Sequence, residues 1–447
     1  MDESRYTLGT FSEGTFLAKY CPYLGFIYIS LIPFNVNISG QLFVHDLLAP
    51  LIVLCIVPAF FQHQTIFLRP PFIFFLGFLL VAALLSFLHY QTYLDIYEYS
   101  IYAYMIILFL FFFIYPPTNN QLRVYGIVVI LSLLVNFFSV FIPNPPIQSS
   151  HTPFENSTLS FVTKRFFFPL GQPNMVGSFF VLPITCFLLG FNESLRKLSS
   201  GRLLFFVVVL SFCCLPLLFT VSKDMLLSMA VIGGWLFAHP KLPRRSVSRP
   251  LLVVGLVSIS FVFYLTVIFP FFPMQRTFPY INTNTFGMYM IDQGIYLNIV
   301  LSDTVTFLIG AGKSTAKEMF PLFVDVGKIS DILLQYNMLW SLDGRLHYRD
   351  SHNEYLNLTA NFGIITALLL YLGIMTTPSL IKAGSYKKTI LIMVVFFLLA
   401  LLLVSLWRDI LSKRWVWITL GIMIGFVRGS GKQVRGKDGA CKERLPT

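Results

Sequence analysis

A histidine occupies the point where a long hydrophilic segment of the chain meets an apolar one. His352 lies in the run from Ser351 to Leu356, and the residues after it are mostly apolar. Imidazole titrates near neutral pH and is the side chain most often used as a general base. A histidine held at a membrane surface could therefore take a proton from a hydroxyl group of a membrane-anchored substrate. The simpler alternative is that His352 caps the following helix or lies in a polar interface.

Basic residues in the hydrophilic segments could supply a second kind of chemistry. Cations in a site that excludes water stabilise the negative charge that develops on a leaving group such as a phosphate. The candidates all lie outside the apolar runs. They are Lys223, Arg276, Arg345 and Arg349, with Lys164 and Arg165 as a second basic pair. Each could instead extend toward lipid headgroups, as basic residues at membrane interfaces often do.

The composition places these residues in a membrane protein. Of the 447 residues 56% are hydrophobic and 12% are charged, whereas soluble domains carry roughly 25% charged residues. A membrane span needs about 20 mainly apolar residues, and a helix satisfies its own backbone groups. We therefore predict an all-α polytopic membrane protein with about twelve transmembrane helices, a count that could differ by one. Their expected bounds are 22–39, 47–61, 70–89, 98–115, 123–143, 173–190, 203–220, 222–237, 250–272, 353–374, 388–407 and 415–427.

Lysine and arginine predict how the chain crosses the membrane, because they remain on the cytoplasmic side more often than they cross it. Most of the 32 basic residues fall on the inner side if the N-terminus is cytoplasmic, which places both termini in the cytoplasm. The whole chain, 1–447, is then one integral membrane domain. It carries a smaller outer loop at 144–172 and a large outer loop at 273–352, between the ninth and tenth helices.

The net charge of +12 is explained by inner loops and a basic tail that face anionic lipid, so nucleic-acid binding is not required. Residues 1–20 lack an apolar core of signal-peptide length, and the first helix is expected to be the insertion signal. The six cysteines avoid both outer loops, and no Cys/His spacing suggests a zinc site. We therefore expect neither a disulfide framework nor a metal ion.

A glycine-rich run in the large loop invites a nucleotide-binding interpretation. The run from Gly310 to Thr315 resembles the end of a phosphate-binding loop, but Phe307 stands where the full pattern needs its first glycine. A glycine turn is the better interpretation. Upstream, residues 288–301 are apolar but interrupted by polar residues such as Asp292, which predicts an amphipathic helix along the membrane surface.

Three short motifs follow one another in the middle of the chain. They are Gly171–Gly177 with Asn174, Leu308–Gly312 with Gly310 and Gly312, and Asp350–Leu356 with His352 and Asn353, the last followed by Asn361–Ile364. Taken together, they resemble motifs of the O-antigen ligase and polymerase superfamily of bacterial membrane enzymes. Their order, spacing and expected placement on one face make the set more specific than any single motif, and the resemblance covers about residues 160–375.

The resemblance implies an enzyme that moves a glycan from an undecaprenyl pyrophosphate carrier to an acceptor hydroxyl at the periplasmic face of the bacterial inner membrane. His352 would be the base, the basic candidates would hold the pyrophosphate, and neither a metal nor a cofactor would be needed. The chain departs from the family at Lys223, where the family carries an arginine after a serine. Lysine keeps the charge but lacks the planar fork that binds phosphate through two hydrogen bonds.

Several functions remain open within and beyond this family. A ligase would transfer the glycan to lipid A core and a polymerase to a second lipid-linked glycan; the position of the His-Asn pair at the end of the large loop favours the ligase by analogy. A secondary transporter would also suit about twelve spans, although its charged residues would be expected near the bilayer midplane. A non-catalytic scaffold is compatible with the lysine at position 223.

Overall fold

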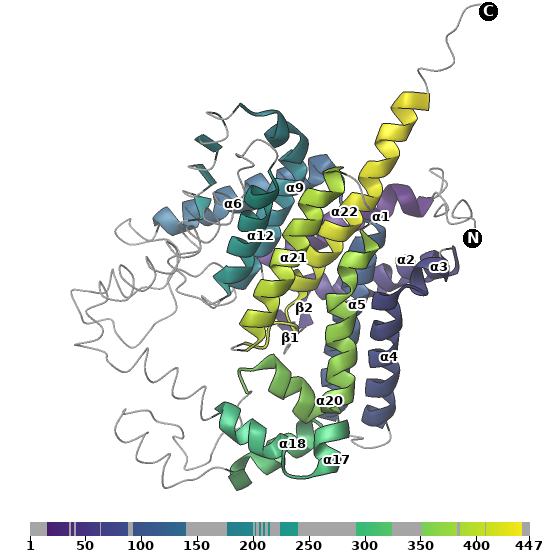
Figure 1. Ribbon diagram of the computed structural model, residues 1–447, viewed down its shortest axis with the longest axis vertical. Coiled ribbons are helices and arrows are strands. Elements are labelled where there is room, and N and C mark those ends of the chain that lie inside the picture. The colour runs from purple at the N-terminus through teal and green to yellow at the C-terminus, as the bar shows by residue number, and fades with distance from the viewer. Residues whose placement is uncertain are drawn as a thin grey trace, which may run out of the picture.

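The protein, seen in a computed structural model, is a bundle of helices (Figure 1). The structure describes residues 16–34, 37–39, 42–62, 64–87, 93–139, 177–199, 224–239, 292–323, 351–381, 385–406 and 408–439, with isolated positions between 202 and 214. The only strands in these ranges are β1 (Asn37–Ser39) and β2 (Leu42–Phe43), which pair antiparallel. The prediction of an all-α membrane protein is therefore confirmed, apart from this short ladder.

The helices follow the apolar runs of the sequence. The longer ones are α1 (Phe16–Leu31), α2 (Ala49–Gln62), α4 (Pro70–Leu85), α5 (Tyr93–Ile114), α6 (Asn119–Ser139), α9 (Val181–Lys197), α12 (Met225–Ala238), α20 (Glu354–Met375), α21 (Ser385–Ser405) and α22 (Arg414–Gly439). The short ones are η2 (Ile32–Phe34), η3 (Val44–Leu48), α3 (Gln64–Phe67), α17 (Thr304–Ile309), α18 (Lys313–Met319), η6 (Phe320–Phe323) and η7 (Thr377–Leu380).

Five helical segments of the described chain are long and apolar enough to cross a membrane. They are Val44–Phe61, Tyr93–Ile114, Gly177–Leu195, Glu354–Leu380 and Lys388–Ser405. Four shorter apolar helices accompany them: Pro70–Leu85, Asn119–Val135, Met225–Ala238 and Arg414–Val427. The predicted span at 250–272 and most of the one at 203–220 lie outside the described residues, so the count of about twelve stays a prediction.

Glycines allow the helix backbones to approach closely. On α22, a Cβ atom added at Gly421 or Gly425 would lie 2.8 Å or 2.6 Å from the carbonyl oxygen of Phe109 or Phe113 on α5. Small residues four apart are a usual device for packing helices in a bilayer, where the hydrophobic effect does not drive helices together. These glycines explain why α22 can lie directly against α5.

Large apolar side chains point away from the bundle along several helices. Leu54 on α2, Leu80 on α4, Leu368 on α20 and Leu403 on α21 are all exposed in the isolated chain. Contiguous exposed apolar surface is unfavourable in water, whereas lipid tails solvate it. The outer surface of the bundle therefore suits a bilayer.

Residues 292–323 form a compact unit that we call the loop element. It consists of a helix at 292–300, followed by α17, α18 and η6, and in Figure 1 it lies at the lower end of the bundle, beside the start of α20. We call this end the loop end. The last part of α22 leaves the bundle at the opposite end.

The helix at 292–300 confirms the helix predicted for 288–301, but its apolar side has a different partner from the one expected. Buried Ile295, Tyr296 and Ile299 pack in one cluster with Phe320 of η6 and Ala360 of α20. The amphipathic pattern thus reflects packing of the helix on the protein, not burial of that side in the membrane surface.

Candidate active site

His352 lies in a tight turn immediately before α20. Its φ of +50° is the one positive value among the described non-glycine residues. The left-handed region costs such a residue about 1–2 kcal/mol and persists only where the surroundings fix it. Here Ser351 fixes it, because its Oγ donates to the carbonyl oxygen of Asn353 at 2.7 Å and accepts the N–H of Asn353 at 3.1 Å. The imidazole projects from this turn with 29% of the side chain exposed.

Asn353, the second residue of the His-Asn pair, caps α20. Its side-chain oxygen accepts a hydrogen bond from the N–H of Leu356 at 3.2 Å, which satisfies one of the free N–H groups of the first turn. The alternative in which His352 caps the helix is therefore wrong. Asn353 of the motif thus fixes where α20 begins.

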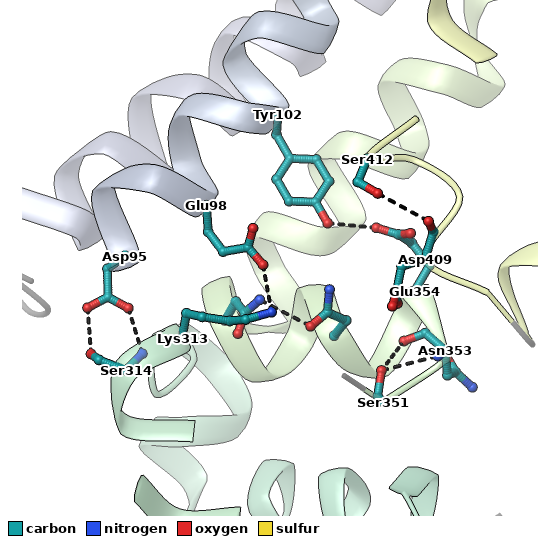
Figure 2. A network of polar contacts seen from close by, with 12 residues as sticks. Asp95, Glu98, Tyr102, Lys313, Ser314, Ser351, Asn353, Glu354, Asp409 and Ser412 are labelled. Atoms are coloured by element: carbon teal, nitrogen blue, oxygen red, sulfur yellow. Dashed lines mark hydrogen bonds and ion pairs between the residues drawn. The ribbon is translucent and has the colours of Figure 1, made fainter. Parts of the chain in front are cut away.

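Glu354 anchors the start of α20 to two other parts of the chain. Its side chain has no exposed surface. The hydroxyl of Tyr102 on α5 donates to Oε1 at 2.7 Å (Figure 2). The N–H of Leu411, just before α22, donates to Oε2 at 3.1 Å. Because Glu354 is two residues from His352, these bonds also fix the position of the turn.

Two of the motifs meet in space at a pair of glycines. α20 changes direction at Gly363, whose φ of 78° and ψ of 163° interrupt the helix. A Cβ atom there would lie 2.2 Å from the carbonyl oxygen of Leu308, and one at Gly310 would lie 2.6 Å from the backbone nitrogen of Gly363. The N–H of Ala311 also donates to the carbonyl of Ala360 at 2.7 Å. The loop element is thus seated directly on the bend in α20.

Acidic residues of α5 hold the same glycine-rich run from the other side. Asp95 accepts hydrogen bonds from the N–H and Oγ of Ser314, at 3.1 Å and 2.7 Å, and Glu98 Oε1 lies 2.8 Å from Lys313 Nζ (Figure 2). A carboxylate of the chain therefore binds the N–H of Ser314 that a nucleotide phosphate would use. Gly310 and Gly312 both have positive φ, a backbone conformation that glycine adopts readily.

A buried carboxylate faces His352 from the loop element. Asp292 stands at the start of the 292–300 helix, its side chain has no exposed surface, and its Oδ2 lies 4.0 Å from Nε2 of His352. The next residue, Gln293, donates from its side chain to the carbonyl of Leu406 at 3.2 Å. The loop element therefore joins His352 to the segment between α21 and α22.

An arginine of that segment provides a cation at the loop end. The side chain of Arg408 is 18% exposed, and its Nε lies 3.8 Å from Oδ1 of Asp224, at the start of α12. Asp224 follows Lys223 directly in the chain. Asp224, the residue after the predicted phosphate-binding lysine, thus contacts Arg408.

Asp303 caps α17 within the loop element. Its carboxylate accepts hydrogen bonds from the hydroxyl of Thr306 at 2.6 Å and from the N–H of Thr306 at 2.8 Å. These bonds favour the charged form and hold the pKa of Asp303 below its usual range. The first turn of α17 is therefore stabilised by a charged cap.

The structure describes only part of the predicted site. Gly310 and Gly312 lie in the loop element, with Gly310 packed on the bend in α20, and His352 and Asn353 form the turn before the same helix. The remaining candidates fall outside the described residues: Lys164, Arg165, Asn174, Lys223, Arg276, Arg345 and Arg349. Their roles stay predictions.

The sequence interpretation missed several residues of this region. In the sequence Asp292 is only a polar interruption of an apolar run, and Arg408 belongs to none of the three motifs. Asp95 and Glu354 lie at the ends of apolar helices, where a charge usually meets water or headgroups. Only the long-range contacts reveal that these carboxylates are buried and bonded.

The described residues contain no group of three or more His, Cys, Asp or Glu side chains arranged to bind a metal ion. The described part of the region instead offers the imidazole of His352, buried carboxylates, and basic side chains that include Arg408. No family model matches the chain, and no curated protein matches it.

Proposed function

We propose that the chain is a membrane glycosyltransferase that moves a glycan from an undecaprenyl pyrophosphate carrier to an acceptor hydroxyl, of the O-antigen ligase type with lipid A core as acceptor. One observation carries the proposal. The loop element, which carries the Gly-x-Gly run, packs on α20 at Gly363, ten residues after the His-Asn turn, and it brings the carboxylate of Asp292 to 4.0 Å from Nε2 of His352.

The geometry suits a direct displacement. His352 accepts the proton of the acceptor hydroxyl while the oxygen bonds to the anomeric carbon of the glycan. The bond from that carbon to the pyrophosphate oxygen breaks, and its electron pair leaves with the pyrophosphate. Proton transfer to a placed base contributes about 10² to 10⁴ in rate. The left-handed turn provides that placement, because it leaves the backbone of His352 little freedom.

The leaving pyrophosphate needs positive charge, and Arg408 is the described residue best placed to supply it. Its planar fork can bind a phosphate through two hydrogen bonds. Lys223 would add a second cation from the adjacent turn, with Arg276, Arg345, Arg349, Lys164 and Arg165 as further candidates. In this proposal Asp224 holds Arg408 in place until the substrate enters.

In this proposal the chain lies in the inner membrane of a bacterium and crosses it about twelve times. The loop at 273–352 is periplasmic and both termini are cytoplasmic. The position of α22 supports this topology. The helix starts at the loop end with Arg414, and its far end, which carries Arg428, Lys432, Arg435 and Lys437, leaves the bundle at the opposite end (Figure 1). A basic helix end opposite His352 fits the rule that positive charges remain inside.

The test is transfer by purified, reconstituted protein supplied with an undecaprenyl pyrophosphate-linked glycan. Glycan on lipid A core supports a ligase, and a lengthened lipid-linked glycan instead makes the protein a polymerase. If neither forms while a known ligase works under the same conditions, the proposal is wrong, and a transporter or scaffold becomes the better interpretation. Arg408→Ala should lose most transfer, whereas Lys317→Ala, at an exposed position of α18, serves as the matched control for loss of a positive charge.

A further inference from the structure

Asp292 is a charged side chain in an unusual place. Its carboxylate has no exposed surface, and burying a carboxylate is costly unless hydrogen bonds or a positive charge compensate it. The imidazole of His352 lies 4.0 Å from its Oδ2. An imidazole becomes positively charged when it takes up a proton, so this carboxylate favours the state that general-base catalysis produces.

The position of Asp292 is set by packing and not by a flexible loop. Ile295, Tyr296 and Ile299 of the same helix are buried against the loop element and α20. Gln293, the next residue, is bonded to the carbonyl of Leu406. A group held in this way keeps its geometry through a reaction, as supporting residues of active sites must.

The turn and the carboxylate act on different parts of His352. The bonds between Ser351 and Asn353 fix the backbone of the turn. Asp292 faces Nε2 of the ring and therefore favours orientations that keep this nitrogen beside the carboxylate.

We propose that Asp292 is a positioning residue that orients the imidazole of His352, which accepts the proton of the acceptor hydroxyl. This inference rests on the proposed glycosyl transfer. The proton passes from the hydroxyl to the imidazole, the acceptor oxygen bonds to the anomeric carbon, and the pyrophosphate departs with the electron pair of the broken bond. Asp292 stays ionised and stabilises the imidazolium, which later releases its proton to water.

The first part of the test uses three variants in the reconstituted transfer assay. Asp292→Asn should lower kcat by about 100-fold or more, within the range for loss of acid-base catalysis, and leave KM within a few fold. His352→Asn keeps a residue that tolerates positive φ but removes the base. The double variant should be no slower than His352→Asn alone, because Asp292 acts only through His352. Additive losses, or an Asp292→Asn variant that stays near wild-type rate, would overturn the inference.

Matched controls separate positioning from folding. Gly294→Ala lies on the same helix at a place where an added Cβ contacts nothing within 4 Å, and should leave kcat unchanged. Asp292→Glu keeps the charge and should recover part of the rate that Asp292→Asn loses. If Asp292→Glu is as slow as Asp292→Asn while both keep the wild-type unfolding temperature, charge-based positioning is contradicted.

A second readout does not depend on activity. In protein labelled with ¹⁵N-histidine, the ring signals of His352 are identified by their absence in His352→Asn, among the seven histidines of the chain. Asp292→Asn should shift those ring signals and Gly294→Ala should not. If wild-type protein transfers no glycan, the proposed function is wrong. The ring signals then test by themselves whether Asp292 orients His352: a shift in Asp292→Asn supports this role, and unchanged signals refute it.

Discussion

Replacement of Gly363 by alanine should separate the loop element from the bend in α20. Gly363 has φ 78° and ψ 163°, a region that is almost exclusive to glycine and costs other residues about 1–3 kcal/mol. The new Cβ would also lie 2.2 Å from the carbonyl oxygen of Leu308 and 2.4 Å from Cα of Ile309. Both are backbone atoms that cannot rotate away, so α17 as a whole must move.

The backbone strain and the steric clash together determine how much docking free energy the loop element should lose. Forcing an extra methyl group into a packed site typically costs about 1–3 kcal/mol, which comes on top of the backbone cost. We therefore expect Gly363→Ala to weaken the docking of the loop element by about 2–6 kcal/mol. Gly310→Ala should have a similar effect, and the double variant should lose less than the two single losses combined, because both changes disrupt the same contact.

The assay is limited proteolysis of the loop element together with thermal unfolding in detergent. Gly363→Ala should increase the rate of cleavage within 292–323 and lower the unfolding temperature. The control, Gly294→Ala, places a methyl group in open space on a helix and should be neutral or stabilise by about 0.5–1 kcal/mol. Wild-type protection in Gly363→Ala would show that the glycine contact does not hold the loop element.

Other contacts of the loop end give three further predictions. Asp95→Asn removes the charge that accepts both bonds from Ser314 and should cost about 1.5–3 kcal/mol in unfolding free energy, whereas an unchanged unfolding temperature would show that the bonds contribute nothing. Tyr102→Phe removes a buried donor to Glu354 and should lower the unfolding free energy by about 1–3 kcal/mol. Thermal unfolding measures this loss, and an unchanged unfolding temperature would contradict the prediction. The pKa of Asp303 is lower in the folded state than in the unfolded state. Its stabilisation of α17 should therefore be present above the unfolded-state pKa and lost as the pH falls through the lower, folded-state value. If lowering the pH speeds proteolysis of the loop element equally in Asp303→Asn and in wild type, this prediction is wrong.

The helices could be predicted from the sequence wherever apolar runs are long. α5, α20 and α21 lie close to their predicted bounds because a membrane helix must be apolar over about 20 residues. The bend at Gly363 was not predicted, because an apolar run looks the same whether its helix is straight or bent. The membrane surface was also the wrong prediction for what the apolar side of the 292–300 helix packs against. The same amphipathic pattern suits a lipid surface and a protein surface equally.

Residues of the candidate site could be predicted from the sequence only where they belong to a motif. His352, Asn353 and the two loop glycines were singled out by local spacing, and the structure packs the loop element that carries the glycines against α20, the helix that follows His352. Asp292 and Glu354 could not be found in this way. Their significance depends on burial and on partners far away in the chain, and no local pattern distinguishes a buried carboxylate from one exposed at a helix end.

The most direct measurement of the central claim is the turnover of His352→Asn, with an undecaprenyl pyrophosphate-linked glycan and lipid A core in the same membrane as the protein. Asparagine tolerates the left-handed backbone of this turn but cannot act as a base. We expect the variant to fold with the wild-type unfolding temperature and to transfer glycan about 10² to 10⁴ times more slowly. Transfer at the wild-type rate would contradict the assignment of His352 as the base.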